Sequence, residues 1–460
     1  MTALTPGAGP GTRPSFGRPE LSRLAGGAGL GLLAAVITGP SGTGDQPLLG
    51  IKGALLDARV VPYLLAGLAL GALFLLHDRG ALSTKAVAGP LQRARTGFAA
   101  LPYAKYVAYA IVALLVLVYP QFVSAFWQGV AVEQIAIYVL LALGLNVVVG
   151  LAGLLDLGYI AFFAIGAYTS AYFTGSLPVK PPIELNAFFV IPIAIVVSMI
   201  AGVILGGPTL RLRGDYLAIV TLGFGEIVRI LAVNGDDIAG KNITDGPRGA
   251  AIPSLAIDVG PLEYTWGLDS LPYYYLVLFF IVLVVIAFKR LEDSRVGRAW
   301  TAIREDEVAA AATGVPTVRY KLLAFAIGAS TSGLAGVLYA SKVGFFAPDN
   351  FLLVASLLVL TMVIFGGMGS IVGVIIGAFV LQWLPNVLRD YVDPADRFIY
   401  FGALIIVMMI FRPQGIVPSK RRARELKLSE SGIGGADAMG TTPGAGAGVG
   451  GGGMGMGSGA

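Results

Sequence analysis

The chain has no cysteine and only one histidine, His77, among its 460 residues. These absences exclude disulfides, thiol catalysis, zinc sites with cysteine ligands and a histidine relay. Charged residues are also scarce, at 13% of the chain, whereas hydrophobic residues make up 56% and the mean hydropathy is +0.79. Soluble domains carry about 25% charged residues. The composition therefore predicts an integral membrane protein.

Apolar runs near the ~20 residues that a helix needs to cross a bilayer recur along the chain. The predicted fold is all-α, a polytopic bundle of about twelve transmembrane helices. The first expected span, 24–37, is short and rich in glycine; a signal peptide is the alternative, but no A-x-A cleavage site follows. The others are 60–76, 104–123, 129–149, 154–174, 187–207, 216–233, 271–288, 322–340, 352–365, 371–388 and 398–411.

The charges of the loops between these spans predict the orientation. Under this assignment the N-terminus, the loop 77–103, the turn with Arg211 and Arg213, the segment 294–321 and the C-terminal tail all lie on one side, and all carry basic residues. Basic loops mark the cytoplasmic side of a membrane protein. We therefore expect both termini in the cytoplasm and the acidic loop 234–270 outside. The net charge of +5 belongs to these loops, so no nucleic-acid binding is expected.

The segment 294–321 is the one long polar helical stretch between spans. Residues 299–312 contain neither glycine nor proline, which predicts a helix of about four turns that ends before Gly314 and Pro316. A short charged helix at the cytoplasmic surface is a suitable docking site through which a soluble partner can move the spans.

The segment 144–158, GLNVVVGLAGLLDLG, places Asn146, Gly150, Gly153 and Asp156 in an apolar context. One interpretation is a discontinuous helix, whose free backbone groups and dipole ends at membrane depth can hold a zwitterion. The alternative is a hairpin turn on the cytoplasmic side. The residues leave both open.

The expected spans contain few ionisable residues, among them Glu133, Glu226 and Arg229. Such residues are functional candidates because charge is costly in lipid. Glu226 and Arg229 are three positions apart on one helix and can neutralise each other. We expect no chain of carboxylates across the membrane, which argues against a proton-driven pump.

Glycines recur at four-residue spacing at Gly369, Gly373 and Gly377, and at Gly202 and Gly206. Such spacing predicts close helix packing. The cluster 366–369, GGMG, predicts a break between two helices because a helix interior tolerates glycine poorly.

The loop sequence 235–242, GDDIAGKN, comes one residue short of a phosphate-binding loop. Asn242 replaces the hydroxyl that would hold magnesium, and Asp236 and Asp237 place negative charge where phosphates would lie. We therefore expect no ATP site and no cofactor in this chain.

Several long segments together resemble the branched-chain amino acid ABC transporter permease family, in its high-affinity leucine/isoleucine/valine type. They are 144–171, 210–231 with 243–250, 294–315, 365–378 and 411–418. The resemblance divides the chain into a disordered basic N-terminus (1–23), additional spans with a cytoplasmic loop (24–103), the permease transmembrane domain (104–418) and a basic, then glycine-rich, disordered tail (419–460).

The resemblance implies a multi-pass subunit of the bacterial plasma (inner) membrane that is not itself an enzyme. It implies cytoplasmic ATPase subunits that bind ATP and magnesium, a second related permease and an extracytoplasmic substrate-binding protein as partners. The segment 294–321 then corresponds to the coupling helix, with Arg304, Glu305, Asp306, Glu307 and Gly314 as coupling residues. Many importer permeases carry a Glu-Ala-Ala pattern followed by glycine here, and this chain places the glycine one position late.

The function that these observations predict is ATP-driven import of branched-chain amino acids by alternating access. The candidates for the substrate pathway are Asn146, Gly150, Gly153, Asp156 and Glu226. Import of urea or short amides is the alternative within the family, because the soluble binding protein does much of the substrate selection. A secondary transporter or channel is less favoured, and an enzyme least, because no active site can be assembled from these residues.

Overall fold

The computed structural model describes residues 104–209, 215–237, 240–259, 262–267, 269–387, Arg389 and scattered positions between 402 and 417. Several features predicted from the sequence lie outside the described residues. They are the N-terminal segment, the spans expected at 24–37 and 60–76, the loop 77–103, Arg211, Arg213 and the tail beyond 418. The chain divides into two compact units. One comprises Met1–Trp127 with Trp383–Ile406, and the other comprises Gln128–Gln382 with Val407–Ala460.

In the first unit, the described residues include helix α5 (Ala104–Phe122) and most of α6 (Ala125–Gly129). Leu114, Leu115 and Phe122 of α5 are 61%, 65% and 83% exposed, as expected for side chains that face lipid. The guanidinium of Arg389 lies 4.8 Å from the centre of the Phe126 ring, a cation–π contact.

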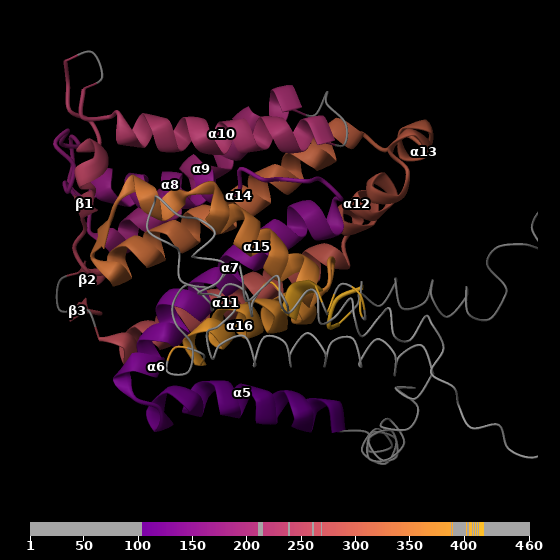
Figure 1. The fold of residues 1–460 in the computed structure, drawn as a ribbon, viewed down its shortest axis with the longest axis horizontal. Helices are drawn as coiled ribbons and strands as arrows, with labels where there is room; N and C mark the ends of the chain where they lie inside the picture. Colours follow the sequence, from indigo (N-terminus) through magenta and orange to yellow (C-terminus); the bar gives the residue numbers. More distant parts are fainter. Residues whose placement is uncertain are drawn as a thin grey trace, which may run out of the picture. The chain divides into compact units, whose positions relative to one another are not determined.

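The second unit is a bundle of long apolar helices (Figure 1). Residues 128–151 of the continuous 27-residue helix Ala125–Leu151 belong to this unit. They include α7 (Ile137–Leu145) between two π-helical stretches, η1 (Val130–Ala136) and η2 (Asn146–Leu151). The other helices are α8 (Ile160–Phe173), α9 (Ala187–Thr209), α10 (Asp215–Val233), α11 (Ser270–Glu292), α12 (Arg295–Glu305), α13 (Glu307–Ala312), α14 (Thr317–Val343), α15 (Leu353–Gly366) and α16 (Ile371–Val387), whose residues 371–382 belong to this unit. Among the described residues, six helices are long and apolar enough to span a membrane.

Helix α14 lies at the centre of this bundle and packs on α7, α8 and α9 through small residues. A Cβ atom on Gly333 would lie 2.2 Å from Ser198 Oγ of α9, and one on Gly166 of α8 would lie 2.3 Å from the Gly333 carbonyl oxygen. A Cβ atom on Gly202 of α9 would lie 2.7 Å from the Cβ atom of Ala329 of α14. The predicted packing role of the Gly202–Gly206 spacing is confirmed. In a membrane the hydrophobic effect does not drive helices together, and small residues favour their association because they let the backbones approach closely.

Helices α15 and α16 meet at the predicted glycine break. Gly367 and Gly369 have φ values of +116° and +81°, conformations that side chains disfavour, and α15 ends at Gly366. Beyond the break, a Cβ atom on Gly373 would lie 2.4 Å from the Gly366 carbonyl oxygen. Both the break and the close packing of this glycine ladder are confirmed.

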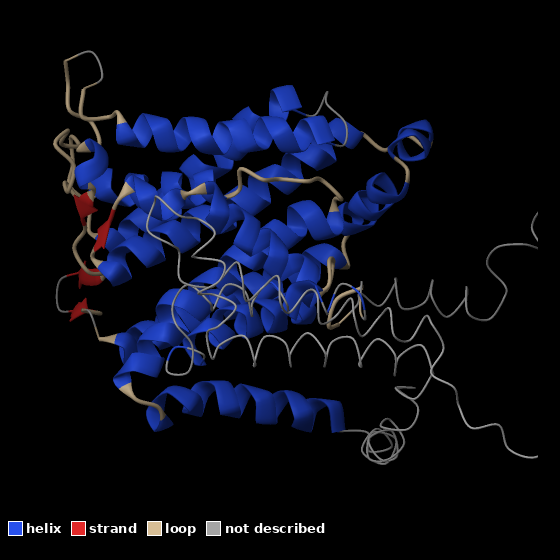
Figure 2. Ribbon diagram, viewed as in Figure 1, coloured by secondary structure: helices blue, strands red, loops and turns tan. Residues whose placement is uncertain are grey.

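The predicted all-α fold needs one correction, because the described residues include two small antiparallel sheets. Strand β1 (Ala250–Ala251) pairs with β4 (Phe345–Phe346), and β2 (Ala256–Val259) pairs with β3 (Leu262–Thr265). Short 3₁₀ turns, η3 (Gly246–Arg248) and η4 (Pro348–Phe351), lie beside them in the chain. These connections lack helical hydrogen bonds, so their backbone groups pair with each other. The strands lie at the opposite end of the second unit from α12 and α13 (Figure 2).

Candidate transport and coupling site

The polar segment between α11 and α14 forms two short helices, so the prediction of one continuous helix over 299–312 is wrong. Ser294 begins α12, with its hydroxyl oxygen accepting from the amide of Val296 at 3.1 Å. Asp306 interrupts the segment in an extended conformation (φ −152°, ψ 107°). Its Oδ1 accepts from the amides of Val308 and Ala309 at 2.8 and 3.0 Å. Aspartate favours this capping position over a helix interior because its side chain competes for backbone amides.

Helix α13 ends at Ala312, two residues before Gly314, so the predicted end of the polar helix is confirmed. Between Gly314 and α14 the chain passes through Pro316, which directly precedes Thr317.

Two contacts fix α12 and α13 to the base of α14. The indole of Trp300, fully buried, donates from Nε1 to the carbonyl oxygen of Tyr320 at 2.7 Å. Glu307 of α13 pairs with Lys321 of α14, with Oε1 and Nζ 2.5 Å apart. The Lys321 side chain is only 6% exposed, so Glu307 is the partner that permits a buried ammonium there. A movement of α13 must therefore act on α14.

A third contact joins α12 to the π-helical stretch η2. Arg304 donates from Nη1 to the carbonyl oxygen of Gly150. The side chain of Asn146, also in η2, accepts at Oδ1 from the amide of Gly369 at 2.8 Å. A Cβ atom on Gly153 would lie 2.7 Å from Arg304 Cγ. We call Asn146, Gly150, Gly153, Arg304 and Gly369 the helix-break joint, because α12 meets both interruptions of the bundle here.

Beyond η2 the chain is not helical, so the predicted span 154–174 begins only at Ile160. The non-helical segment 152–159 leads from Gly153, which lies beside Arg304, to Tyr159. The Tyr159 hydroxyl donates to the Gly328 carbonyl oxygen at 3.0 Å. Gly328 lies eleven residues into α14, about 16 Å from its start at ~1.5 Å per residue. The segment therefore follows the interior of the bundle, as the discontinuous-helix interpretation expects, rather than turning at its end.

Asp156 lies on this extended segment and is fully buried. Its Oδ1 accepts from the amide of Gly158 at 3.0 Å, whereas Oδ2 has no hydrogen-bond partner in the part of the chain that the structure describes. The neighbouring backbone is held by Thr221 of α10, whose hydroxyl accepts from the amide of Leu157 at 3.0 Å. The described residues contain no group of three or more His, Cys, Asp or Glu side chains placed to hold a metal ion.

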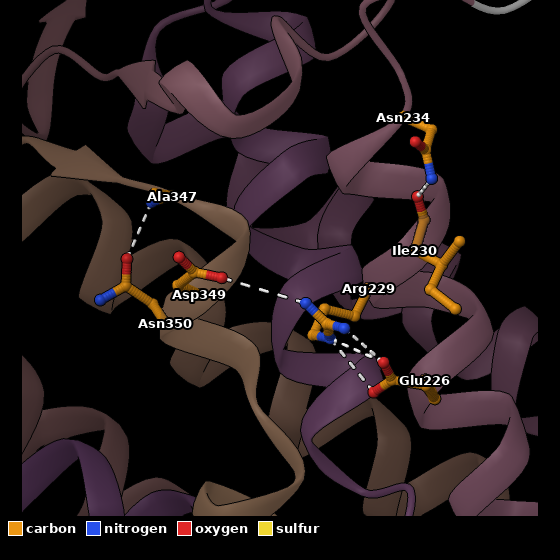
Figure 3. Close-up of polar contacts among 7 residues, drawn as sticks. All are labelled: Glu226, Arg229, Ile230, Asn234, Ala347, Asp349 and Asn350. Atoms are coloured by element: carbon orange, nitrogen blue, oxygen red, sulfur yellow. Dashed lines mark hydrogen bonds and ion pairs between the residues drawn. The ribbon is translucent and has the colours of Figure 1, made fainter. Parts of the chain in front are cut away.

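Glu226 lies on α10, away from the joint, and the predicted pair with Arg229 is confirmed (Figure 3). Arg229 Nε donates to both carboxylate oxygens of Glu226, at 3.0 and 3.1 Å, and Nη2 also bonds Oε1. Asp349 of η4 adds a second carboxylate, with Oδ1 3.9 Å from Arg229 Nη1. This cluster lies near the C-terminal end of α10, on the side of the strands.

Glu133, the third ionisable residue expected within a span, pairs with Lys342 near the C-terminal end of α14. Its Oε1 lies 3.8 Å from Lys342 Nζ, whose side chain is 3% exposed. Lys342 Nζ also lies 5.8 Å from the centre of the Tyr273 ring.

The predicted candidates thus do not form a single cluster. Asn146, Gly150, Gly153 and Arg304 come together at the joint, with Asp156 on the adjoining segment. Glu305 is exposed on α12, and Glu226 lies at the other end of the bundle. The sequence interpretation did not identify Trp300, Lys321 or Asp349, and it assigned Gly369 only to helix packing and to the break between two helices. A tryptophan in a polar helix is nevertheless a signal for an anchor.

Comparisons with known proteins agree with this architecture. The family model described as "Branched-chain amino acid transport system / permease component" matches residues 130–412. The high-affinity branched-chain amino acid transport system permease protein LivM of Escherichia coli is 43% identical over 338 residues, 69% of this chain and 76% of that protein. LivM of Salmonella typhimurium is 42% identical over 314 residues, 64% of this chain and 71% of that protein.

A second kind of permease is more distantly similar. LivH of Escherichia coli is 26% identical over 304 residues, 64% of this chain and 95% of that protein. No solved structure matches the chain significantly. The family match covers more than half of the chain, and the bundle has the membrane-spanning helices of a multi-pass inner-membrane protein. The chain belongs to the family of branched-chain amino acid transport system permease components.

Proposed function

We propose that this chain is a permease subunit of an ATP-driven importer that carries branched-chain amino acids into the cytoplasm by alternating access. The family and the named function of its relatives support this proposal. ATP and magnesium are bound by separate cytoplasmic ATPase subunits, and the chain itself makes and breaks no covalent bond. The observation that carries the mechanism is the joint through which α12 contacts the bundle interior at the Gly150 carbonyl.

In this proposal α12 and α13 together form the coupling element that docks on the ATPase. Glu305 and Val308 face outward, with Val308 62% exposed. Three other coupling residues make contacts within the chain. Arg304 donates to the Gly150 carbonyl oxygen of η2, Glu307 pairs with Lys321 of α14, and Asp306 caps α13. Gly314 ends the element and lets the chain return to α14. ATPase closure would then displace α12 and α13 and, through these contacts, the helices beside the pathway.

We further propose that the α12–α13 end is cytoplasmic and the strand end extracytoplasmic, with both termini in the cytoplasm. A substrate-binding protein would deliver the amino acid at the strand end. A second, related permease would complete the pathway, and the full chain would have about twelve transmembrane helices. The candidates that would border the pathway are Asn146, Gly150, Gly153, Asp156 and Glu226. Among them, Asp156 Oδ2 has no hydrogen-bond partner in the described residues and would be available to a zwitterion.

Reconstitution into proteoliposomes tests this function. Uptake of radiolabelled leucine should require the ATPase subunits, ATP and the binding protein together. Uptake in vesicles that lack the ATPase subunits but carry an ion gradient would instead identify a secondary transporter. Uptake of urea in place of leucine would support the short-amide alternative.

A further inference from the structure

We propose that Arg229, Glu226 and Asp349 form a binding site for the charged groups of an amino acid at the strand end of α10. The guanidinium of Arg229 would take the carboxylate of the substrate, and the two carboxylates would take its ammonium group. This inference rests on the proposed function and adds residues that recognise the substrate.

The exposure of the pair is the first observation. Glu226 and Arg229 lie within the apolar helix Tyr216–Val233, which is long enough to span a membrane, yet their side chains are 39% and 23% exposed. Lipid offers no hydrogen bonds to charged groups. The flank of α10 that carries them must therefore face water or a polar partner surface. A water-filled pathway for a polar solute would provide the water that this flank requires.

The geometry leaves part of the guanidinium available. Arg229 uses Nε and Nη2 for Glu226, whereas Nη1 faces Asp349 Oδ1 at 3.9 Å, beyond hydrogen-bond distance. The Asp349 side chain is 84% exposed. A substrate carboxylate can bind Nη1 without breaking the Glu226 contact. Arginine suits this task because its fork of donors matches a carboxylate.

Asp349 of this cluster lies in a turn that is closed by its own hydrogen bonds (Figure 3). The Oδ1 atom of Asn350 accepts from the amide of Ala347 at 2.8 Å, which closes the turn that carries Asp349. Asn350 Nδ2 lies 3.3 Å from the hydroxyl of Tyr339 on α14. Asp349 is thereby placed across from Arg229 by backbone structure rather than by the ion pair alone.

An open, apolar surface of α10 lies beside the charges. A Cβ atom added to Gly223 would meet no described atom within 4 Å, and Gly223 is one helical turn from Glu226. Ile230, on the turn after Glu226, is 46% exposed. Positions three and four apart are neighbours on a helix surface. The cluster thus offers both signs of charge next to an apolar surface, which fits a branched-chain zwitterion and not neutral urea.

The test uses the complete importer in proteoliposomes with saturating binding protein loaded with radiolabelled leucine. Uptake and ATP hydrolysis are measured for Glu226→Gln/Arg229→Gln, for Asp349→Asn and for the charge exchange Glu226→Arg/Arg229→Glu. Lys180→Gln/Glu184→Gln is the control, because it removes an exposed ion pair, 63% exposed on both side chains, from the α8–α9 loop.

We expect uptake to fall about 10- to 100-fold in the neutral double variant, as the loss of charged hydrogen bonds implies, with ATP hydrolysis retained. Asp349→Asn should raise the apparent KM, and the control should transport normally. The charge exchange should stay inactive although it preserves an ion pair. Restored uptake there, or normal uptake in the neutral variant, would overturn the proposal and identify a structural pair. Absence of leucine uptake by the unmodified complex would instead contradict the proposed function.

Discussion

Among single residues, Gly150 has very little room for a side chain. A Cβ atom there would lie 2.1 Å from Asn146 Oδ1 and 2.5 Å from the amide nitrogen of Gly369. Gly150→Ala should therefore cost about 1–3 kcal/mol, as overpacking of tight interiors does, and disrupt the Asn146–Gly369 bond. Thermal unfolding of the purified protein measures this change.

Gly207→Ala provides the matched control, because a Cβ atom at this helical position of α9 would meet no described atom within 4 Å. It should be neutral or stabilise the protein by roughly 0.5–1 kcal/mol. Equal effects of the two substitutions would contradict the assignment of Gly150 to a tight joint.

The Glu307–Lys321 pair predicts strong coupling between its two members. Glu307→Gln alone leaves the buried ammonium of Lys321 unpaired, so it should destabilise more than the double change Glu307→Gln/Lys321→Met. A double-mutant cycle on unfolding should give an interaction energy of about 0.5–3 kcal/mol.

The exposed Lys289–Glu292 pair, whose atoms lie 2.8 Å apart with side chains 50% and 35% exposed, is the comparison. Its cycle should give only about 0–1 kcal/mol. Additive effects in the Glu307–Lys321 cycle would show that α13 is not held to α14 by this pair.

Residue contacts were predictable only where spacing along one helix determines them. Glu226 and Arg229 are three positions apart, and their pairing follows from helix geometry alone. Asp349 lies 120 positions beyond Arg229, so its approach depends on how η4 packs beside α10. The contacts of Arg304 with Gly150 and of Glu307 with Lys321 likewise required the tertiary structure.

At the scale of elements, Asp306 divides the polar segment between α11 and α14 into two helices. Asp306→Ala removes the cap of α13 and should cost about 0.5–2 kcal/mol locally, whereas Asp306→Asn should keep the cap. The amides of Val308 and Ala309 should then exchange hydrogen about 2- to 30-fold faster in Asp306→Ala than in Asp306→Asn. Equal exchange in both variants would mean that the side chain does not hold α13.

Most spans of the described region were predictable because apolar runs of bilayer length leave few alternatives. Helices α9, α10 and α11 begin within one residue of their predicted starts. The start of α8 was not predictable, because the apolar residues of 152–158 suit a buried extended chain as well as a helix. The interruption at Asp306 was missed because a run of alanines follows it and favours helix.

For the whole molecule, the absence of cysteine makes the proposed orientation testable by labelling. Val308→Cys on α13, at a position 62% exposed, should react with a membrane-impermeant maleimide only from the cytoplasmic side. Tyr264→Cys on β3, at a position 51% exposed, should react only from outside. Labelling of both from the same side of sealed vesicles would contradict the orientation.

The membrane class and the family were predictable at this scale. The hydropathy indicates a membrane protein, and several long segments resemble the permease family. The position of the joint was not, because it brings residues around 150, 304 and 369 together through the packing of three separate segments. The proposed function depends on whether movement of α12 passes through the helix-break joint.

The most direct measurement is the number of leucine molecules imported per ATP hydrolysed by Arg304→Met, with Arg295→Met, an exposed arginine at the start of the same helix, as control. Loss of the Arg304–Gly150 hydrogen bond should lower uptake about tenfold, the effect of one charged hydrogen bond, while ATP hydrolysis continues. The ratio should therefore fall in Arg304→Met and stay normal in Arg295→Met. An unchanged ratio in Arg304→Met would contradict transmission through the joint.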